Sequence, residues 1–173
     1  MADDNLSNEA SAAVAARRRR DTLDSSMLNA PWRTIAIAGS IAGVVDIAAA
    51  SLIHSARPDR IMQAIAAGLL GRESFKDGAW SSVLGFSLQI FMSCLIAAIY
   101  VIATRRLPAF RRSWIVLGLA YGVIVFGVMN YVVMPLSAVG KSPTFTAARF
   151  TEELAAMLVF GLIITFIDHR RAE

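Results

Sequence analysis

The stretch that decides the fold is Thr34 to Ile53, TIAIAGSIAGVVDIAAASLI, which is apolar along its whole length except for one carboxylate, Asp46. About twenty such residues form a helix long enough to span the ~30 Å hydrocarbon core of a bilayer. A charged side chain inside such a segment is costly, so it faces packed protein or water rather than lipid. The stretch therefore predicts a membrane-spanning helix that carries a protected aspartate.

The composition of the whole chain is that of a membrane protein. Of its 173 residues 56% are hydrophobic and 17% are charged, whereas about a quarter of the residues in a soluble domain are charged. This composition excludes a soluble globular domain. The net charge is +4, and the basic residues flank the apolar stretches. Anionic lipid head groups are therefore the expected partner, and nucleic acid is not.

Three further apolar stretches follow the first one. We predict an all-α integral membrane protein, a four-helix bundle with one membrane domain over residues 32–169. A polar tail with an arginine run, residues 1–31, precedes that domain, and residues 170–173 follow it. The predicted spans are residues 34–53, 83–103, 114–134 and 150–167.

The first loop between spans contains a short helical pattern that cannot cross a membrane. Pro58 opens this piece and Gly71 closes it, as proline and glycine commonly do at the two ends of a helix. Ile61, Ile65 and Leu69 recur every four residues within it. We expect either an interfacial helix with this apolar stripe facing the membrane or a re-entrant segment, and the sequence leaves both open.

The distribution of basic residues predicts the orientation, because cytoplasmic loops carry an excess of Lys and Arg. We expect both termini to be cytoplasmic in a bacterial inner membrane. In this orientation the eleven inside residues are Arg17, Arg18, Arg19, Arg20, Arg33, Arg105, Arg106, Arg111, Arg112, Arg170 and Arg171, and the six outside residues are Arg57, Arg60, Arg72, Lys76, Lys141 and Arg149. The run Arg17, Arg18, Arg19 and Arg20 has two interpretations, a topology signal or a contact with the lipid surface.

Each predicted span places its strongest polar side chain in the same outer half of the membrane. Asp46 lies about 10 Å below the outer end of its span at 1.5 Å per residue, and the others lie at similar depth. The candidate polar pocket consists of Asp46, Gln89, Asn130 and Glu153. Gln89 and Asn130 also fit a purely structural role as hydrogen-bonding contacts between helices. We expect Asp46 to be protonated, paired with Arg149 or Arg57, or in contact with water or a cation.

Two pairs of glycines predict close helix packing. Gly39 and Gly43 share one face of the first span with Asp46, and Gly118 and Gly122 form a second pair in the third span. Glycines four residues apart allow another helix to approach closely within a membrane.

The chain resembles an uncharacterised family of small four-span bacterial inner-membrane proteins. The resemblance rests on AGVVD at 42–46, RIMQAIAAGLLGRESF at 60–75, RRLP at 105–108 and MNYVVMPLSA at 129–138. It covers residues 35–169 and implies the architecture and a bacterial inner membrane. It implies no catalytic residue.

The favoured function from the sequence is a structural or interaction bundle that packs in the bilayer, as a homo-oligomer or within a larger membrane complex. The alternative is a transporter or channel-like component with a periplasm-facing pocket centred on Asp46. No motif indicates an enzyme, and no cofactor or metal ligand set is expected, because the single cysteine and the two histidines form no cluster.

Overall fold

The four apolar stretches form long helices in the computed structural model of the chain, which describes residues 14, 17, 31–76, 78–106, 113–140 and 146–172. The protein is an all-helical membrane bundle with four helices long and apolar enough to cross a bilayer. Helix α2 is Pro31–Ile53 and α4 is Ala79–Arg106. The third crossing consists of α5 (Trp114–Val128), the π-helical turn η3 (Met129–Val133) and α6 (Met134–Leu136), and the fourth is α7 (Ala147–Ala172).

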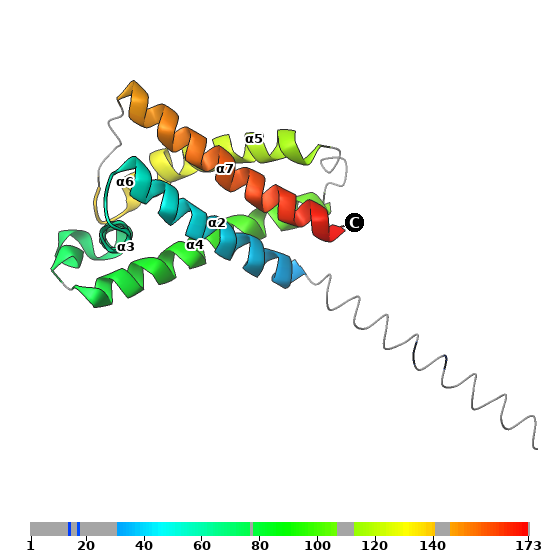
Figure 1. Cartoon of the computed structure of the whole chain (residues 1–173), viewed down its shortest axis with the longest axis horizontal. Coiled ribbons are helices and arrows are strands. Elements are labelled where there is room, and N and C mark those ends of the chain that lie inside the picture. Colours follow the sequence, from blue (N-terminus) through cyan, green and yellow to red (C-terminus); the bar gives the residue numbers. More distant parts are fainter. Residues whose placement is uncertain are drawn as a thin grey trace, which may run out of the picture.

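The long helices lie side by side, and α2 and α7 form the centre of the arrangement (Figure 1). Helix α2 packs against α4 on one side and against α7 on the other, and α7 packs against α5. Since the chain crosses four times, the start of α2 and the end of α7 lie at the same end of the bundle. We call the opposite end, where α2 finishes and α7 begins, the His54 end.

The pairing of α5 with α7 depends on three glycines at the crossing point. A Cβ atom on Gly161 would overlap the backbone of Gly118 and Gly122, and one on Gly122 would lie 2.5 Å from the carbonyl oxygen of Met157. Such close backbone contact gains van der Waals energy where lipid supplies no hydrophobic driving force. The Gly118 and Gly122 pair is therefore used within the chain.

The pairing of α2 with α4 uses the other two glycines in the same way. A Cβ atom on Gly39 would lie 2.6 Å from the Cα of Cys94, and one on Gly43 would lie 2.7 Å from the hydroxyl of Ser93. All four of the glycines expected to pack helices thus face helices of the same chain.

The short helix of the first loop, α3 (Pro58–Leu70), lies across the His54 end of the bundle and is seen nearly along its axis in Figure 1. A Cβ atom on Gly85 of α4 would overlap the carbonyl of Met62, so the two backbones touch. The amide of Ala138, beyond α6, donates a hydrogen bond of 2.7 Å to the carbonyl of Gly68. Helix α3 therefore bridges α4 and the end of the third crossing.

The face of α3 that packs on protein differs from the predicted apolar stripe. Ala66 and Ala67 are buried together with Ile61 and Gln63, whereas Leu69 is 63% exposed. The prediction of one stripe for Ile61 and Leu69 was wrong, because small alanines allow the close approach to α4 and the larger side chain points outward. Leu69 has the exposure expected of a side chain that contacts membrane.

Candidate functional site

Asp46 and Gln89 face each other between α2 and α4. The amide nitrogen Nε2 of Gln89 donates a hydrogen bond of 2.7 Å to Oδ2 of Asp46. The glycine contacts explain this geometry, because Gly43 brings α2 onto Ser93 of α4. About one turn nearer the His54 end on both helices, Asp46 meets Gln89. Two of the four predicted pocket residues are therefore in direct contact.

Asp46 also lines a groove of about 260 Å³ between α2 and α7. Its walls are mostly aliphatic, and its two charged residues are Asp46 and Glu152. Since α2 and α7 are antiparallel, Asp46 lies level with Val159 and Phe160 at the deep end, and Glu152 lies near Ile53 at the His54 end. The lining residues are Val45, Asp46, Ala49, Leu52, Ile53, Glu152, Ala155, Ala156, Val159 and Phe160.

Of the three alternatives stated for Asp46, pairing with Arg149 or Arg57 does not occur. Arg57 pairs with Asp59, with 3.2 Å between Nε and Oδ1, and the guanidinium of Arg149 contacts Nδ1 of His54. The prediction of an ion pair from Asp46 to either arginine was wrong, because both have partners at the surface of the His54 end. Within the described part of the chain, Asp46 has a hydrogen-bond donor but no basic side chain beside it.

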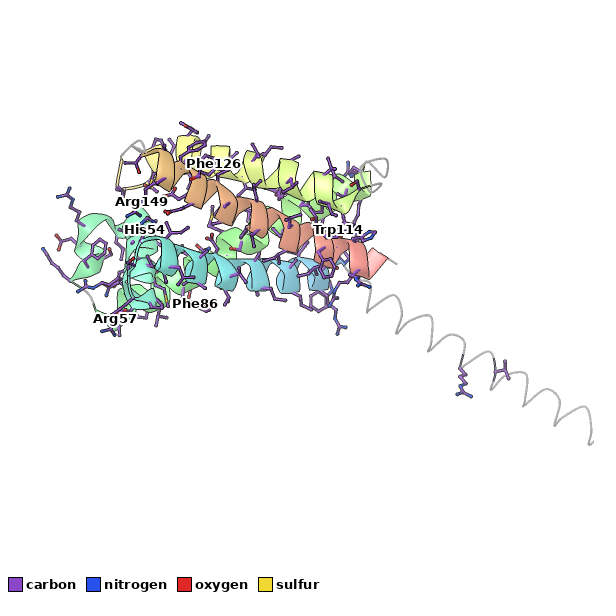
Figure 2. All side chains as sticks on the ribbon, turned by 45° about the horizontal axis from the view of Figure 1, so that its top comes forward. His54, Arg57, Phe86, Trp114, Phe126 and Arg149 are labelled. Carbon is purple, nitrogen blue, oxygen red and sulfur yellow. The ribbon has the colours of Figure 1, made fainter. Side chains whose placement is uncertain are left out.

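Glu153, the fourth crossing's candidate, lies at the rim of the groove rather than in its lining. Its carboxylate is 3.9 Å from Nε2 of His54, so His54 lies between Glu153 and Arg149. Figure 2 shows His54 and Arg149 together at this end, far from Trp114 at the other. The adjacent residue Glu152 lines the groove instead. Adjacent residues of a helix point about 100° apart, so only one of the two glutamates can face α2. The sequence alone did not determine which one does.

Asn130 lies apart from the groove, in the π-helical turn of the third crossing. It is buried, and its Nδ2 donates a hydrogen bond of 3.0 Å to the carbonyl of Phe126 in its own helix. A π-turn widens the helix and leaves carbonyls without their usual partners, and an amide side chain in the turn can occupy one of them. The structure thus places Asn130 in a local backbone role, distinct from Asp46 and Gln89.

A second carboxylate, at the opposite end of the bundle, was missed in the sequence. Asp168 is 5% exposed, and the Thr104 hydroxyl donates a hydrogen bond of 3.3 Å to its Oδ2. In the sequence Asp168 immediately precedes His169, Arg170 and Arg171, and it was not among the candidate site residues. The signal was present in α4, where Ser93, Tyr100 and Thr104 recur at spacings of seven and four and share one buried face.

In the described ranges no three His, Cys, Asp or Glu side chains come together in a way that could hold a metal ion. Of the basic run Arg17, Arg18, Arg19 and Arg20, only Arg17 is described, as an exposed helical residue, and the other three lie outside the described residues.

No protein-family model, curated protein or solved structure matches the chain. The geometry of the groove is therefore the basis for a functional proposal.

Proposed function

We propose that this membrane protein binds a cation at Asp46 and acts as a transporter-like component with a site open toward the periplasm. One observation carries the proposal. A carboxylate inside a crossing lines a groove and, in the described part of the chain, has no basic side chain to balance it. A carboxylate within a membrane needs a proton or a counter-ion, because the hydrocarbon around it solvates charge poorly.

The groove lies in the half of the bundle nearer the His54 end, which supports access from that end. Its upper rim is formed by Ile53 and Glu152 at the His54 end, and Asp46 lies about 10 Å below that rim at 1.5 Å per residue. The excess of Lys and Arg at the opposite end supports a cytoplasmic location for both termini, so the His54 end is periplasmic in this proposal.

A hydrophobic carbodiimide tests this site, because such reagents add to carboxyl groups inside membranes. We expect intact mass spectrometry of the protein in lipid nanodiscs to show one slow adduct at Asp46, with labelling slowed by at least one member of a panel of inorganic and alkylammonium cations. The Asp46→Asn variant retains an acceptor for Gln89 and should lose the adduct.

Asp168→Asn is the matched control, because it removes the carboxylate at the other end of the bundle and should leave the cation-sensitive adduct in place. The proposal fails if Asp46 takes no label, or if no cation in the panel slows its labelling.

One argument for the structural or interaction bundle that the sequence favours no longer applies. The glycine faces of α2 and α5 are occupied by α4 and α7, so they offer no surface to a second copy. Contact of the basic tail with lipid or with a partner stays a proposal that depends on residues outside the described part of the chain.

A further inference from the structure

The groove between α2 and α7 has a carboxyl group at each end and aliphatic walls between. The deep end has Asp46 and the rim has Glu152. Glu152 lies at the His54 end of α7, because the carboxylate of the adjacent residue Glu153 is 3.9 Å from the imidazole of His54. Since seven residues separate Asp46 from Ile53, which lies level with Glu152, the two carboxyl groups are about 10 Å apart along the helix axis.

The walls between the two carboxylates have no other charged group. Ala49, Ala155 and Ala156 line the middle of the groove with short side chains, and Leu52 and Val159 contribute aliphatic side chains at its open edges. Walls of this kind favour a methylene chain, because each methylene group that leaves water adds to the affinity. A compact hydrated ion would leave these walls unused.

The volume of the groove accommodates a short chain. A methylene or an ammonium group takes up roughly the ~30 Å³ that a water molecule occupies in the liquid. The groove of about 260 Å³ therefore has room for at least about eight such groups.

From these observations we infer that the groove binds a linear alkyl diamine or polyamine, with one ammonium group at Asp46, one at Glu152 and the methylene chain against the aliphatic walls. This inference rests on the proposed cation site and names its ligand class. Alkyl amines are protonated at neutral pH, as the side chain of lysine is. Both ends of the ligand would then form charge-assisted hydrogen bonds to carboxylates.

A homologous series of diamines tests the inference by length. We expect 1,6-diaminohexane to bind the protein in nanodiscs more tightly than 1,3-diaminopropane or 1,12-diaminododecane, as measured by isothermal titration calorimetry and by protection of Asp46 from the carbodiimide. Hexylamine has the same chain with one charge and should bind roughly tenfold to a hundredfold more weakly, the range that one charge-assisted hydrogen bond supplies. Adipate has a similar chain with the opposite charges and should not bind.

Matched variants separate the two ends of the ligand. Glu152→Gln should weaken 1,6-diaminohexane by about the same factor as the loss of one amine and leave hexylamine unchanged. Glu153→Gln is the control, because that carboxylate faces His54 and does not line the groove. Asp46→Asn should weaken both ligands.

The possible failures are distinct. If hexylamine binds as tightly as the diamine and Glu152→Gln has no effect, the diamine inference is wrong while the cation site at Asp46 stands. If Glu153→Gln weakens binding as much as Glu152→Gln does, the rim acts only through its net charge and the inference is again wrong. If no amine binds and Asp46 shows no cation-sensitive labelling, both the inference and the proposed function fail.

Discussion

In the described part of the chain, Gln89 donates the only hydrogen bond to the side chain of Asp46. This contact links α2 with α4. Hydrogen bonds between membrane helices are worth about 0.6 kcal/mol on average and up to about 1.7 kcal/mol. The bond of 2.7 Å is short and joins a carboxyl oxygen to an amide, so we expect its contribution to lie in the upper part of that range.

A double-mutant cycle measures that contribution. We expect Gln89→Leu to destabilise the protein, and the coupling free energy between Gln89→Leu and Asp46→Ala to be about 1.5 kcal/mol. Unfolding in mixed micelles with increasing dodecyl sulfate, followed by circular dichroism, gives the free energies. Ser87→Ala is the control on the same helix, because its exposed hydroxyl bonds only the carbonyl of Val83. Additive free energies for Asp46 and Gln89 would show that the bond contributes nothing to stability.

At the scale of elements, the paired helices approach each other through backbone contacts at glycines, beside a core of larger side chains such as Tyr100, Phe160 and Ile164. The α5 and α7 backbones meet at Gly118, Gly122 and Gly161. A methyl group at such a contact forces the helices apart, and overpacking of this kind costs about 1–3 kcal/mol.

Two glycine substitutions separate packing from helix propensity. Gly161→Ala should lower the free energy of unfolding by about 2 kcal/mol despite the better helix propensity of alanine. Gly127→Ala in α5 adds the same methyl group where no atom lies within 4 Å, and it should be neutral or slightly stabilising. Unfolding in mixed micelles again provides the measurement, and equal effects of the two substitutions would contradict the packing argument.

Helix α3 is fixed to the bundle by the contact of its backbone with Gly85. We expect Gly85→Ala to push the Met62 carbonyl away and loosen α3, because a Cβ atom there overlaps that carbonyl. Hydrogen exchange followed by mass spectrometry should show faster exchange over residues 58–70, while Ser87→Ala leaves the rate unchanged. Unchanged exchange in the Gly85→Ala variant would mean that α3 is held by its other contacts.

The elements and their number followed from the sequence, whereas the rotation of each side chain about its helix did not. Long apolar runs predicted the four crossings, and the glycine spacing placed Asp46 on the face that meets α4. The pairings of Arg57 and Arg149 depended on loop geometry, so the sequence left open whether either arginine contacts Asp46. The choice between Glu152 and Glu153 depended on the crossing of α2 with α7. The role of Asn130 depended on a local π-turn, which leaves no pattern in hydrophobicity.

At the scale of the whole molecule, the even number of crossings places both termini on one side, and the charges decide which side. In the proposed orientation eleven basic residues lie inside and six outside. Four of the eleven form the run Arg17 to Arg20, which lies within the distance of the first crossing over which basic residues influence insertion. The run therefore contributes more than any other segment to the difference.

Replacing Arg17 to Arg20 with glutamine leaves seven basic residues inside against six outside, so the bias almost disappears. We expect the wild-type chain with a green fluorescent protein after Glu173 to fluoresce, and alkaline phosphatase fused after Ala56 or Ser137 to be active. The glutamine variant should insert in both orientations and show reduced fluorescence with phosphatase activity at Glu173. A lysine variant keeps the charge and should behave as wild type. If the glutamine variant keeps a single orientation, the arginine run is not the topology signal, and a contact with lipid or a cytoplasmic partner becomes its better explanation.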